Sequence, residues 1–306
     1  MHRVLGWGAI CAVVLATGCS KSSIKVDGSS TVLRVSEAVV EEFRKEQPEV
    51  RVTVGRAGTG GGFKKLSHGE IDICDASRPI NEIERQACEA NGIEFVELEI
   101  AFDGLTVVVN PKNNWCDCLS VEQLKALWQP ESAVNKWSDL NPAWPDREIK
   151  LYGPGTDSGT FDYFTEAIVG KAGSSRADYS PSEDDNSLVT GVAGDADALG
   201  YFGLAYYEEN QNRLKVLGID PGDGKCVIPS QETVRDHSYK PLSRPLFIYV
   251  RKSSLERSEV RSFVEFYLDQ VGNLVEVVGY VPLPDDVLAK SKQNLAEVLS
   301  SQTPKL

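Results

Sequence analysis

Hydrophobic residues follow two different spacings along the first third of the chain. The segment VRVTVG (50–55) carries a valine at every second position, which predicts a short strand. The segment before it predicts a helix, because apolar residues fall on one helical face: Val32, Val35, Val39 and Phe43. Further apolar runs predict strands: IDICDA (71–76), IEFVELEI (93–100) and GLTVVVN (104–110). This succession predicts an α/β fold with a parallel-rich sheet covered by helices on both faces.

Capping signals indicate where two of the helices begin. Asn81 and Glu84 have the spacing of a capping box and open the segment NEIERQACEA, and Gly92 stands at a position that favours the end of that helix. Ser120 and Gln123 repeat the pattern before VEQLKALW. Both segments are therefore predicted to be helices.

The length of 306 residues predicts two domains, since a single core usually spans roughly 100 to 200 residues. After Asn110 the sequence changes to NPKNNWCDC, which predicts a crossing into a second domain. The apolar segment RPLFIYV, from Arg244 to Val250, predicts a buried strand that returns to the first domain. We therefore expect one lobe of residues 20–110 plus 244–306 and a second lobe of residues 111–243.

The amino-terminal segment MHRVLGWGAICAVVLATGCS has basic residues, an apolar core and then small residues before Cys19. This pattern predicts a secretory signal over residues 1–19, with an apolar core shorter than the roughly 20 residues of a membrane span. The ending ATGC resembles a lipobox, the bacterial signal after which the cysteine is lipidated. We therefore expect a periplasmic protein, or one held by a lipid on Cys19 at the outer face of the cytoplasmic membrane. The alternative is an ordinary signal in which Cys19 is incidental.

Export implies an oxidising compartment, in which cysteines form disulfides. The candidates are Cys74, Cys88, Cys116, Cys118 and Cys226. Their odd number leaves one over, and the sequence does not determine the pairing. For Cys116 and Cys118 we expect that each bridges elsewhere or that one stays free.

Charge and histidine content exclude several classes of function. The 32 basic and 45 acidic residues give a net charge of -13, which argues against nucleic-acid binding because that needs a broad basic surface. The three histidines, His2, His68 and His237, have no zinc-site spacing, and SSIK (22–25) lacks the companion motifs of β-lactam enzymes. The sequence therefore predicts neither an enzyme nor a bound cofactor or metal.

Three loops repeat one design in which hydroxyl residues and glycines follow a predicted strand and precede a helix. They are DGSST (27–31), GTGGG (58–62) and GTDSGT (155–160). Each design directs unpaired backbone N–H groups and the positive end of a helix dipole toward one point, which favours an anion. At the carboxyl ends of strands in an open α/β sheet, such loops lie where ligands bind. The alternative for any single loop is a simple N-cap.

A fourth segment, DASRP (75–79), also follows a predicted buried strand. Ser77 offers a hydroxyl, and Arg78 is expected to give the only full positive charge of the site, bidentate to an oxyanion. The alternative is that Arg78 forms a surface ion pair.

These residues resemble a known family. DGSSTV, GTGGGFKKL, GEIDICDASRPI, GPGTDSGTFDYF, PLSRPLFIYV and GYVPLP occur in the order found in the phosphate-binding proteins that serve bacterial ABC phosphate importers. The resemblance runs from about residue 24 to past residue 283. It implies two α/β lobes, each a mixed sheet flanked by helices, that close around one phosphate in the cleft between them. It also implies delivery of phosphate to a membrane permease.

The resemblance carries ligand-binding roles onto residues of three loops: Ser30, Thr31, Thr59, Gly60, Ser158, Gly159 and Thr160. This chain departs from the best-known members, which have an aspartate in place of Arg78 and an arginine in place of Pro154. Asp157 replaces a glycine in the same loop. We infer that the charges have exchanged sides of the cleft, with Arg78 on the first lobe and Asp157 on the second.

A carboxylate in the site bears on selectivity. Phosphate near neutral pH keeps a proton that it can donate, whereas sulfate does not, so a carboxylate accepts from the first and repels the second. Asp157 is the candidate acceptor and Asp75 the second choice, while the alternative role for Asp157 is to cap the following helix.

Together these observations predict an exported, lipid-anchored and monomeric receptor for inorganic phosphate that serves an ABC importer. The alternatives are a receptor for another tetrahedral oxyanion, such as sulfate, phosphonate or molybdate, or a phosphate-ester hydrolase. A third is a sensor or adhesion protein on the same fold.

Overall fold

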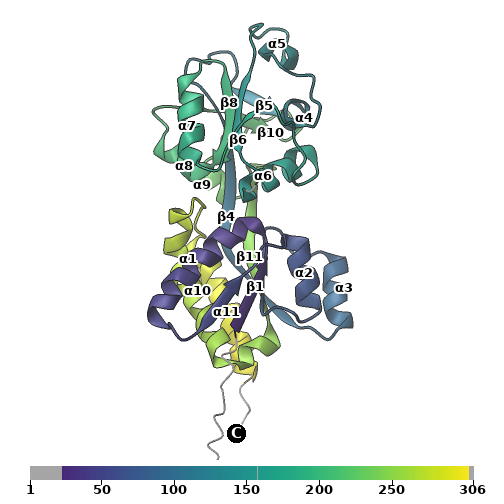
Figure 1. Ribbon diagram of the computed structural model, residues 1–306, viewed down its shortest axis with the longest axis vertical. Coiled ribbons are helices and arrows are strands. Elements are labelled where there is room, and N and C mark those ends of the chain that lie inside the picture. Colours follow the sequence, from purple (N-terminus) through teal and green to yellow (C-terminus); the bar gives the residue numbers. More distant parts are fainter. Residues whose placement is uncertain (1–22, 157, 303–306) are drawn as a thin grey trace, which may run out of the picture.

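The computed structural model describes residues 23–156 and 158–302. The molecule is elongated, with two lobes stacked along its long axis and β4 running from one to the other (Figure 1). A single mixed sheet extends through both lobes in the strand order β2-β1-β3-β11-β4-β8-β6-β7, and β9 also pairs with β4. The predicted two-lobe α/β fold is confirmed.

The lobe that is lower in Figure 1 contains the first strands and helices of the chain and the last helices. Its elements are β1(Ser23–Gly28), α1(Ser30–Glu46), β2(Arg51–Val54), α2(Thr59–Ser67), β3(Ile73–Ala76), α3(Glu82–Ala90), η2(Lys252–Glu256), α10(Ser258–Val277) and α11(Asp285–Gln302). The predicted apolar face of α1 is buried and packs with α10 on the sheet. The capping box at Asn81 is present, and Gly92 follows the end of α3 with φ +66°.

The upper lobe is built from the middle of the chain. Its elements are β5(Cys118–Ser120), α4(Val121–Trp128), α5(Trp137–Leu140), β6(Lys150–Pro154), α6(Gly159–Phe164), η1(Thr165–Val169), β7(Ser180–Ser182), α7(Asp185–Gly194), β8(Ala198–Gly203), α8(Leu204–Glu209), β9(Lys215–Val216), β10(Gly218–Asp220) and α9(Gln231–Arg235). The capping box at Ser120 is present. Its core is rich in aromatic residues, with Trp128 packed against Phe164 and Tyr201.

Two long antiparallel strands connect the lobes. The segments predicted as separate strands at 93–100 and 104–110 form one strand, β4(Phe95–Val109). It pairs with β11(Ser243–Arg251) along its first part and with β8 along its second. The break at Asp103 and Gly104, which separates the two apolar runs in the sequence, is spanned because partners on both sides hold the backbone extended.

The expectation of a parallel-rich sheet is correct only at its two ends. Strand β1 pairs in parallel with β2 and β3, and β6 with β7 and β8, whereas β11 and β4 pair antiparallel to each other and to their outer neighbours. Residues 96–101 of β4 belong to the lower core, and residues 105, 107 and 109 to an upper one. The lobe limits at residues 110 and 244 stay a prediction.

One disulfide joins Cys118 to Cys226 and ties β5 to the segment after β10. Cys74, Cys88 and Cys116 are free and buried. Of the pair that the sequence analysis considered together, one cysteine is therefore bridged and the other is free. Within the described residues, none of the helices is long and apolar enough to cross a membrane.

Candidate anion-binding site

A cavity of about 220 Å³ lies between the two lobes. Most of its lining residues are polar, and they come from the ends of β1 and β3, the start of α2, helix α6 and strand β11. They are Ser29, Ser30, Thr31, Gly58, Thr59, Gly60, Ser77, Arg78, Asp162, Tyr163, Glu166, Ala172 and Arg244. Loops predicted from widely separated stretches of the sequence therefore meet at one point.

The turn from β1 into α1 brings hydroxyl groups to this cavity. The Ser29 side chain caps α1 and accepts hydrogen bonds from the backbone N–H groups of Thr31 and Val32 at 3.2 and 3.4 Å. Ser29 is therefore occupied as a cap, which leaves Ser30 and Thr31 to face the opposite wall. Gly28 makes the turn possible, because its φ is +146° and a Cβ there would lie 2.1 Å from the Asp75 carbonyl oxygen.

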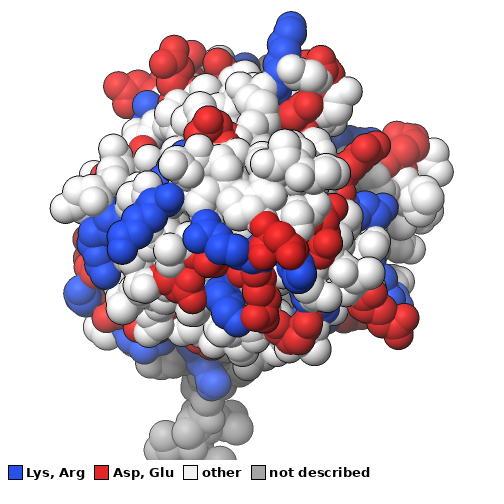
Figure 2. Space-filling model, turned by 90° about the horizontal axis from the view of Figure 1, so that it is seen from above, with Lys and Arg blue, Asp and Glu red and all other residues white. Residues whose placement is uncertain are grey.

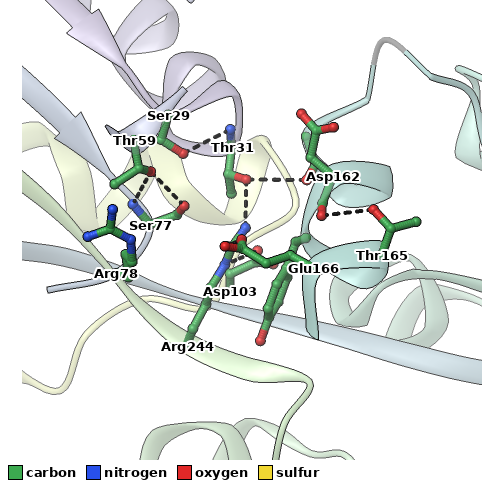
Figure 3. Close-up of polar contacts among 12 residues, drawn as sticks. Ser29, Thr31, Thr59, Ser77, Arg78, Asp103, Asp162, Thr165, Glu166 and Arg244 are labelled. Atoms are coloured by element: carbon green, nitrogen blue, oxygen red, sulfur yellow. Dashed lines mark hydrogen bonds and ion pairs between the residues drawn. The ribbon is translucent and has the colours of Figure 1, made fainter. Parts of the chain in front are cut away.

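The second loop places Thr59 at the start of α2, beside the segment that follows β3. The Thr59 hydroxyl lies 3.1 Å from the Ser77 hydroxyl and accepts a hydrogen bond from the Ser77 backbone N–H at 3.2 Å. Figure 3 shows these two residues together on one side of the site, with Arg78 next to them. Gly60 also lines the cavity.

Arg78 lines the cavity but is already engaged with a carboxylate. Its guanidinium donates to both oxygens of Glu84 at 2.8 and 2.9 Å, and it lies over the Phe63 ring at 5.5 Å. The hydrogen bond from Glu84 raises the pKa of Arg78 further. The ion pair that the sequence analysis considered as an alternative is therefore present, and it leaves part of the guanidinium at the cavity.

The expectation that Arg78 is the only positive charge of the site is wrong, because Arg244 also lines the cavity. Arg244 projects from β11, one of the strands that join the lobes, and Figure 3 shows it between the two walls. Its guanidinium donates to the Thr31 hydroxyl at 2.8 Å, pairs with Asp103 at 3.3 Å and lies 3.5 Å from the centroid of the Tyr163 ring.

Asp103 holds Arg244 from below. The carboxylate is 2% exposed, and burial raises its pKa while Arg244 pulls that pKa back down. A buried carboxylate paired with a guanidinium fixes both side chains, since leaving either one unpaired is costly. Arg244 is therefore held in place before any ligand arrives.

The third predicted loop provides packing between the lobes. Ser158 caps α6 through the Thr160 backbone N–H at 3.2 Å, and Ser158, Gly159 and Thr160 are all buried. The Gly159 carbonyl accepts a hydrogen bond from the Thr31 hydroxyl at 3.4 Å. These residues lie behind the cavity wall, and the side chains that line it from this helix are Asp162, Tyr163 and Glu166.

The two carboxylates on this wall face the other lobe. Asp162 accepts a hydrogen bond from the Ser30 hydroxyl at 3.0 Å, and a Glu166 oxygen lies 3.9 Å from Arg244. Glu166 stands in η1, a π-helical turn that continues α6, and such turns are frequent at functional sites.

The two candidate proton acceptors have different outcomes. Asp157 lies outside the described residues, as does Cys19 with the rest of the predicted signal. The Asp75 carboxylate is fully buried and accepts hydrogen bonds from the Ser36 hydroxyl at 2.9 and 3.0 Å, inside the lower lobe. Burial raises the pKa of Asp75 to about 7. Because it faces Ser36 and is not part of the cavity lining, it is not an acceptor for a ligand there.

Sequence reasoning missed Arg244, Asp103, Asp162 and Glu166. Arg244 stands inside the quoted motif PLSRPLFIYV, where the buried strand drew the attention, and Asp162 stands inside SGTFDYF. A signal for Arg244 was its position at the start of an apolar strand, where a charge has to be paired or functional.

The fold and the polar cavity between two lobes define a ligand-binding protein without a built-in prosthetic group. In keeping with this, a family model described as "PBP superfamily domain" matches residues 15–271. Protein SphX of Synechocystis sp. is 50% identical over 284 residues, which cover 91% of this chain and 84% of that protein. The phosphate-binding protein PstS of Staphylococcus saprophyticus is 37% identical, over 94% and 89% of the two chains.

A solved structure gives the same result. The crystal structure of a possible phosphate-binding protein from Planctomyces limnophilus is 48% identical and superposes with a TM-score of 0.88, covering 91% of this chain and 99% of that one. The chain belongs to the PBP superfamily and, within it, to the family of the SphX and PstS phosphate-binding proteins.

Proposed function

We propose that this protein is an extracytoplasmic receptor that binds inorganic phosphate and delivers it to the membrane permease of an ABC importer. The observation that carries the proposal is the cavity between the lobes, which presents hydroxyl groups and two guanidinium groups at the N-termini of α1 and α2. The relatives named as phosphate-binding proteins support the choice of ligand. A putative phosphate ABC transporter substrate-binding protein from Clostridium perfringens, solved with bound phosphate, is 26% identical with a TM-score of 0.57.

We assign the ligand contacts to residues of both lobes. From the lower lobe, the donors are the hydroxyls and backbone N–H groups of Ser30, Thr31, Thr59, Gly60 and Ser77, together with Arg78. Arg244 adds a second cation from β11. Ser158, Gly159 and Thr160 act by holding α6 against α1, which brings the acidic wall to the ligand.

No catalytic step is part of this proposal. The described residues contain no group of three or more His, Cys, Asp or Glu side chains that could hold a metal ion, and the site consists of donors and acceptors. Closure of the lobes is driven by the ligand, since each lobe contributes only part of the contacts.

Export, lipidation at Cys19 and a monomeric state complete the proposal. The total charge of -13 favours a soluble receptor, and basic and acidic side chains are mixed on the face seen from above (Figure 2). Metabolic labelling with a radioactive fatty acid tests the anchor, because Cys19→Ala should remove the label.

The decisive test is isothermal titration of the mature protein, stripped of anions, with phosphate and then with sulfate at equal ionic strength. Phosphate heat without sulfate heat is expected. A preference for sulfate, molybdate or a phosphonate would instead assign the site to another oxyanion, and no heat with any of them would reject an anion receptor.

Asp157 keeps its proposed part in selectivity. Asp157→Asn should weaken phosphate binding and let sulfate compete, because an amide no longer repels an aprotic dianion. Unchanged selectivity in the same titration would remove Asp157 from the site.

A further inference from the structure

The upper wall of the cavity carries two carboxylates that the proposed phosphate contacts do not use. Asp162 and Glu166 are four residues apart on a continuous helix, so they project from the same side, and both line the cavity. One Asp162 oxygen accepts the Ser30 hydroxyl at 3.0 Å, and the other has no hydrogen-bond donor among the described residues. Glu166 is 56% exposed and lies at the Arg244 guanidinium.

The charges around the cavity do not favour a dianion. Arg78 is paired with Glu84 and Arg244 with Asp103, so both guanidinium charges are already balanced. Asp162 and Glu166 then add two negative charges on the ligand side. Like charges about 4 Å apart repel by about 4 kcal/mol at the effective dielectric of a protein surface, so each further negative charge on the ligand is costly.

We propose that the site selects the doubly protonated monoanion of phosphate, which donates one hydrogen bond to Asp162 and one to Glu166. This inference rests on the proposed function. The monoanion has two O–H groups and two unprotonated oxygens, so it matches an acceptor wall on one side and a donor wall on the other. The monohydrogen dianion leaves one carboxylate facing a bare oxygen, and sulfate leaves both.

The arrangement explains why the lower wall supplies donors and the upper wall acceptors. Hydroxyl donors and the two arginines meet the unprotonated oxygens from one side. Figure 3 shows Glu166 reaching toward Arg244 from the opposite side, with Asp162 above it on the same helix. A ligand with only acceptor oxygens satisfies one wall, whereas the monoanion satisfies both.

The experiment measures phosphate affinity between pH 6.5 and 8.5 at constant ionic strength. Phosphate loses its second proton near neutral pH, and above that point the monoanion fraction falls about tenfold per pH unit. The apparent Kd for total phosphate should therefore rise by about tenfold per unit. The protein groups that face the ligand across this range are Arg78, Glu84, Asp103, Asp162, Tyr163, Glu166 and Arg244.

Two variants separate the carboxylates from other causes. Glu166→Gln and Asp162→Asn keep an acceptor oxygen but remove the charge, so the rise in Kd should fall below about threefold per unit and sulfate affinity should rise by about tenfold. Glu166 is exposed, which makes its variant the safer one to fold. Glu46→Gln is the matched control, since Glu46 ends α1 about 24 Å from its N-terminus at 1.5 Å per residue, and it should keep the wild-type slope.

The outcomes are distinct. A Kd that is constant with pH, or that falls as the pH rises, would overturn the selection of the monoanion while leaving the phosphate receptor intact. The same holds if Glu166→Gln and Asp162→Asn both keep the wild-type slope. Absence of phosphate binding at every pH would instead overturn the proposed function.

Discussion

The two walls of the cavity differ in chemistry. The lower wall consists of helix N-termini, hydroxyls and Arg78, which are donors, whereas the upper wall presents Asp162 and Glu166, which are acceptors. Arg244 comes from a strand shared by both lobes and contacts each wall. Neither wall is complete alone, so the comparison indicates that the site depends on how closely the lobes approach.

The cores behind the walls differ as well. Behind the lower wall lies a buried polar group, in which Asp75 accepts from Ser36 and Ser36 lies 3.1 Å from the Tyr267 hydroxyl. Behind the upper wall, Phe164 stacks on Tyr201 with ring centroids 3.7 Å apart. The lower lobe is therefore expected to respond to pH more strongly than the aromatic upper lobe.

The approach of the walls is most easily broken at Gly159. A Cβ there would lie 2.8 Å from the Thr31 backbone nitrogen, and backbone atoms cannot move aside as a flexible side chain can. Gly159→Ala should therefore lower phosphate affinity about 100-fold or more in calorimetry. Gly194→Ala is the control, because nothing lies within 4 Å of a Cβ there. Near-normal affinity in Gly159→Ala would mean that the lobes need not come this close.

Removing the cation shared by both walls should have the next largest effect. Arg244→Gln loses charge-assisted hydrogen bonds worth about 1.5 to 3 kcal/mol and leaves Asp103 buried without its partner, so affinity should fall roughly 10- to 100-fold. Arg51→Gln, on an exposed position of β2, serves as the charge-matched control. If Arg244→Gln binds normally while unfolding at lower temperature, Arg244 is only a structural link.

The difference between the two cores predicts a pH effect on stability. Burial raises the pKa of Asp75 to about 7 in the folded protein, above its usual value of 3.8. Its contribution to folding is therefore complete below the unfolded pKa and is lost as the pH rises through 7. Asp75→Asn should remove about 1 to 2 kcal/mol of the stability difference between pH 5 and pH 8. Equal slopes of unfolding free energy against pH in both proteins would contradict this.

A single hydroxyl of the lower wall should have the smallest effect. Thr59→Val removes a group that contacts Ser77 and the cavity, and one hydrogen bond is worth about 1 kcal/mol, or roughly fivefold in Kd. Thr59→Ser keeps the hydroxyl and should bind within about twofold of the wild type. A loss as large in Thr59→Ser would point to the methyl group and to packing.

Sequence reasoning recovered the lower wall better than the upper one. Ser30, Thr59 and Ser77 stand in short motifs at strand ends, and turns of that kind reach the same edge of a sheet in any α/β fold. Asp162 and Glu166 lie within an ordinary amphipathic helix, where acidic residues are common. Their position at the cavity depends on how α6 is rotated against α1, which no local pattern encodes.

The sequence by itself determined the two-lobed α/β class, the capped helices and the loops that carry hydroxyls, because spacing and capping act within a few residues. The tertiary structure alone decided that β4 runs unbroken through both lobes and that Cys118 pairs with Cys226. It also decided that Asp75 faces the core while Arg244 faces the cavity. These features depend on contacts between residues far apart in the chain, and their free energy appears only once the lobes are packed.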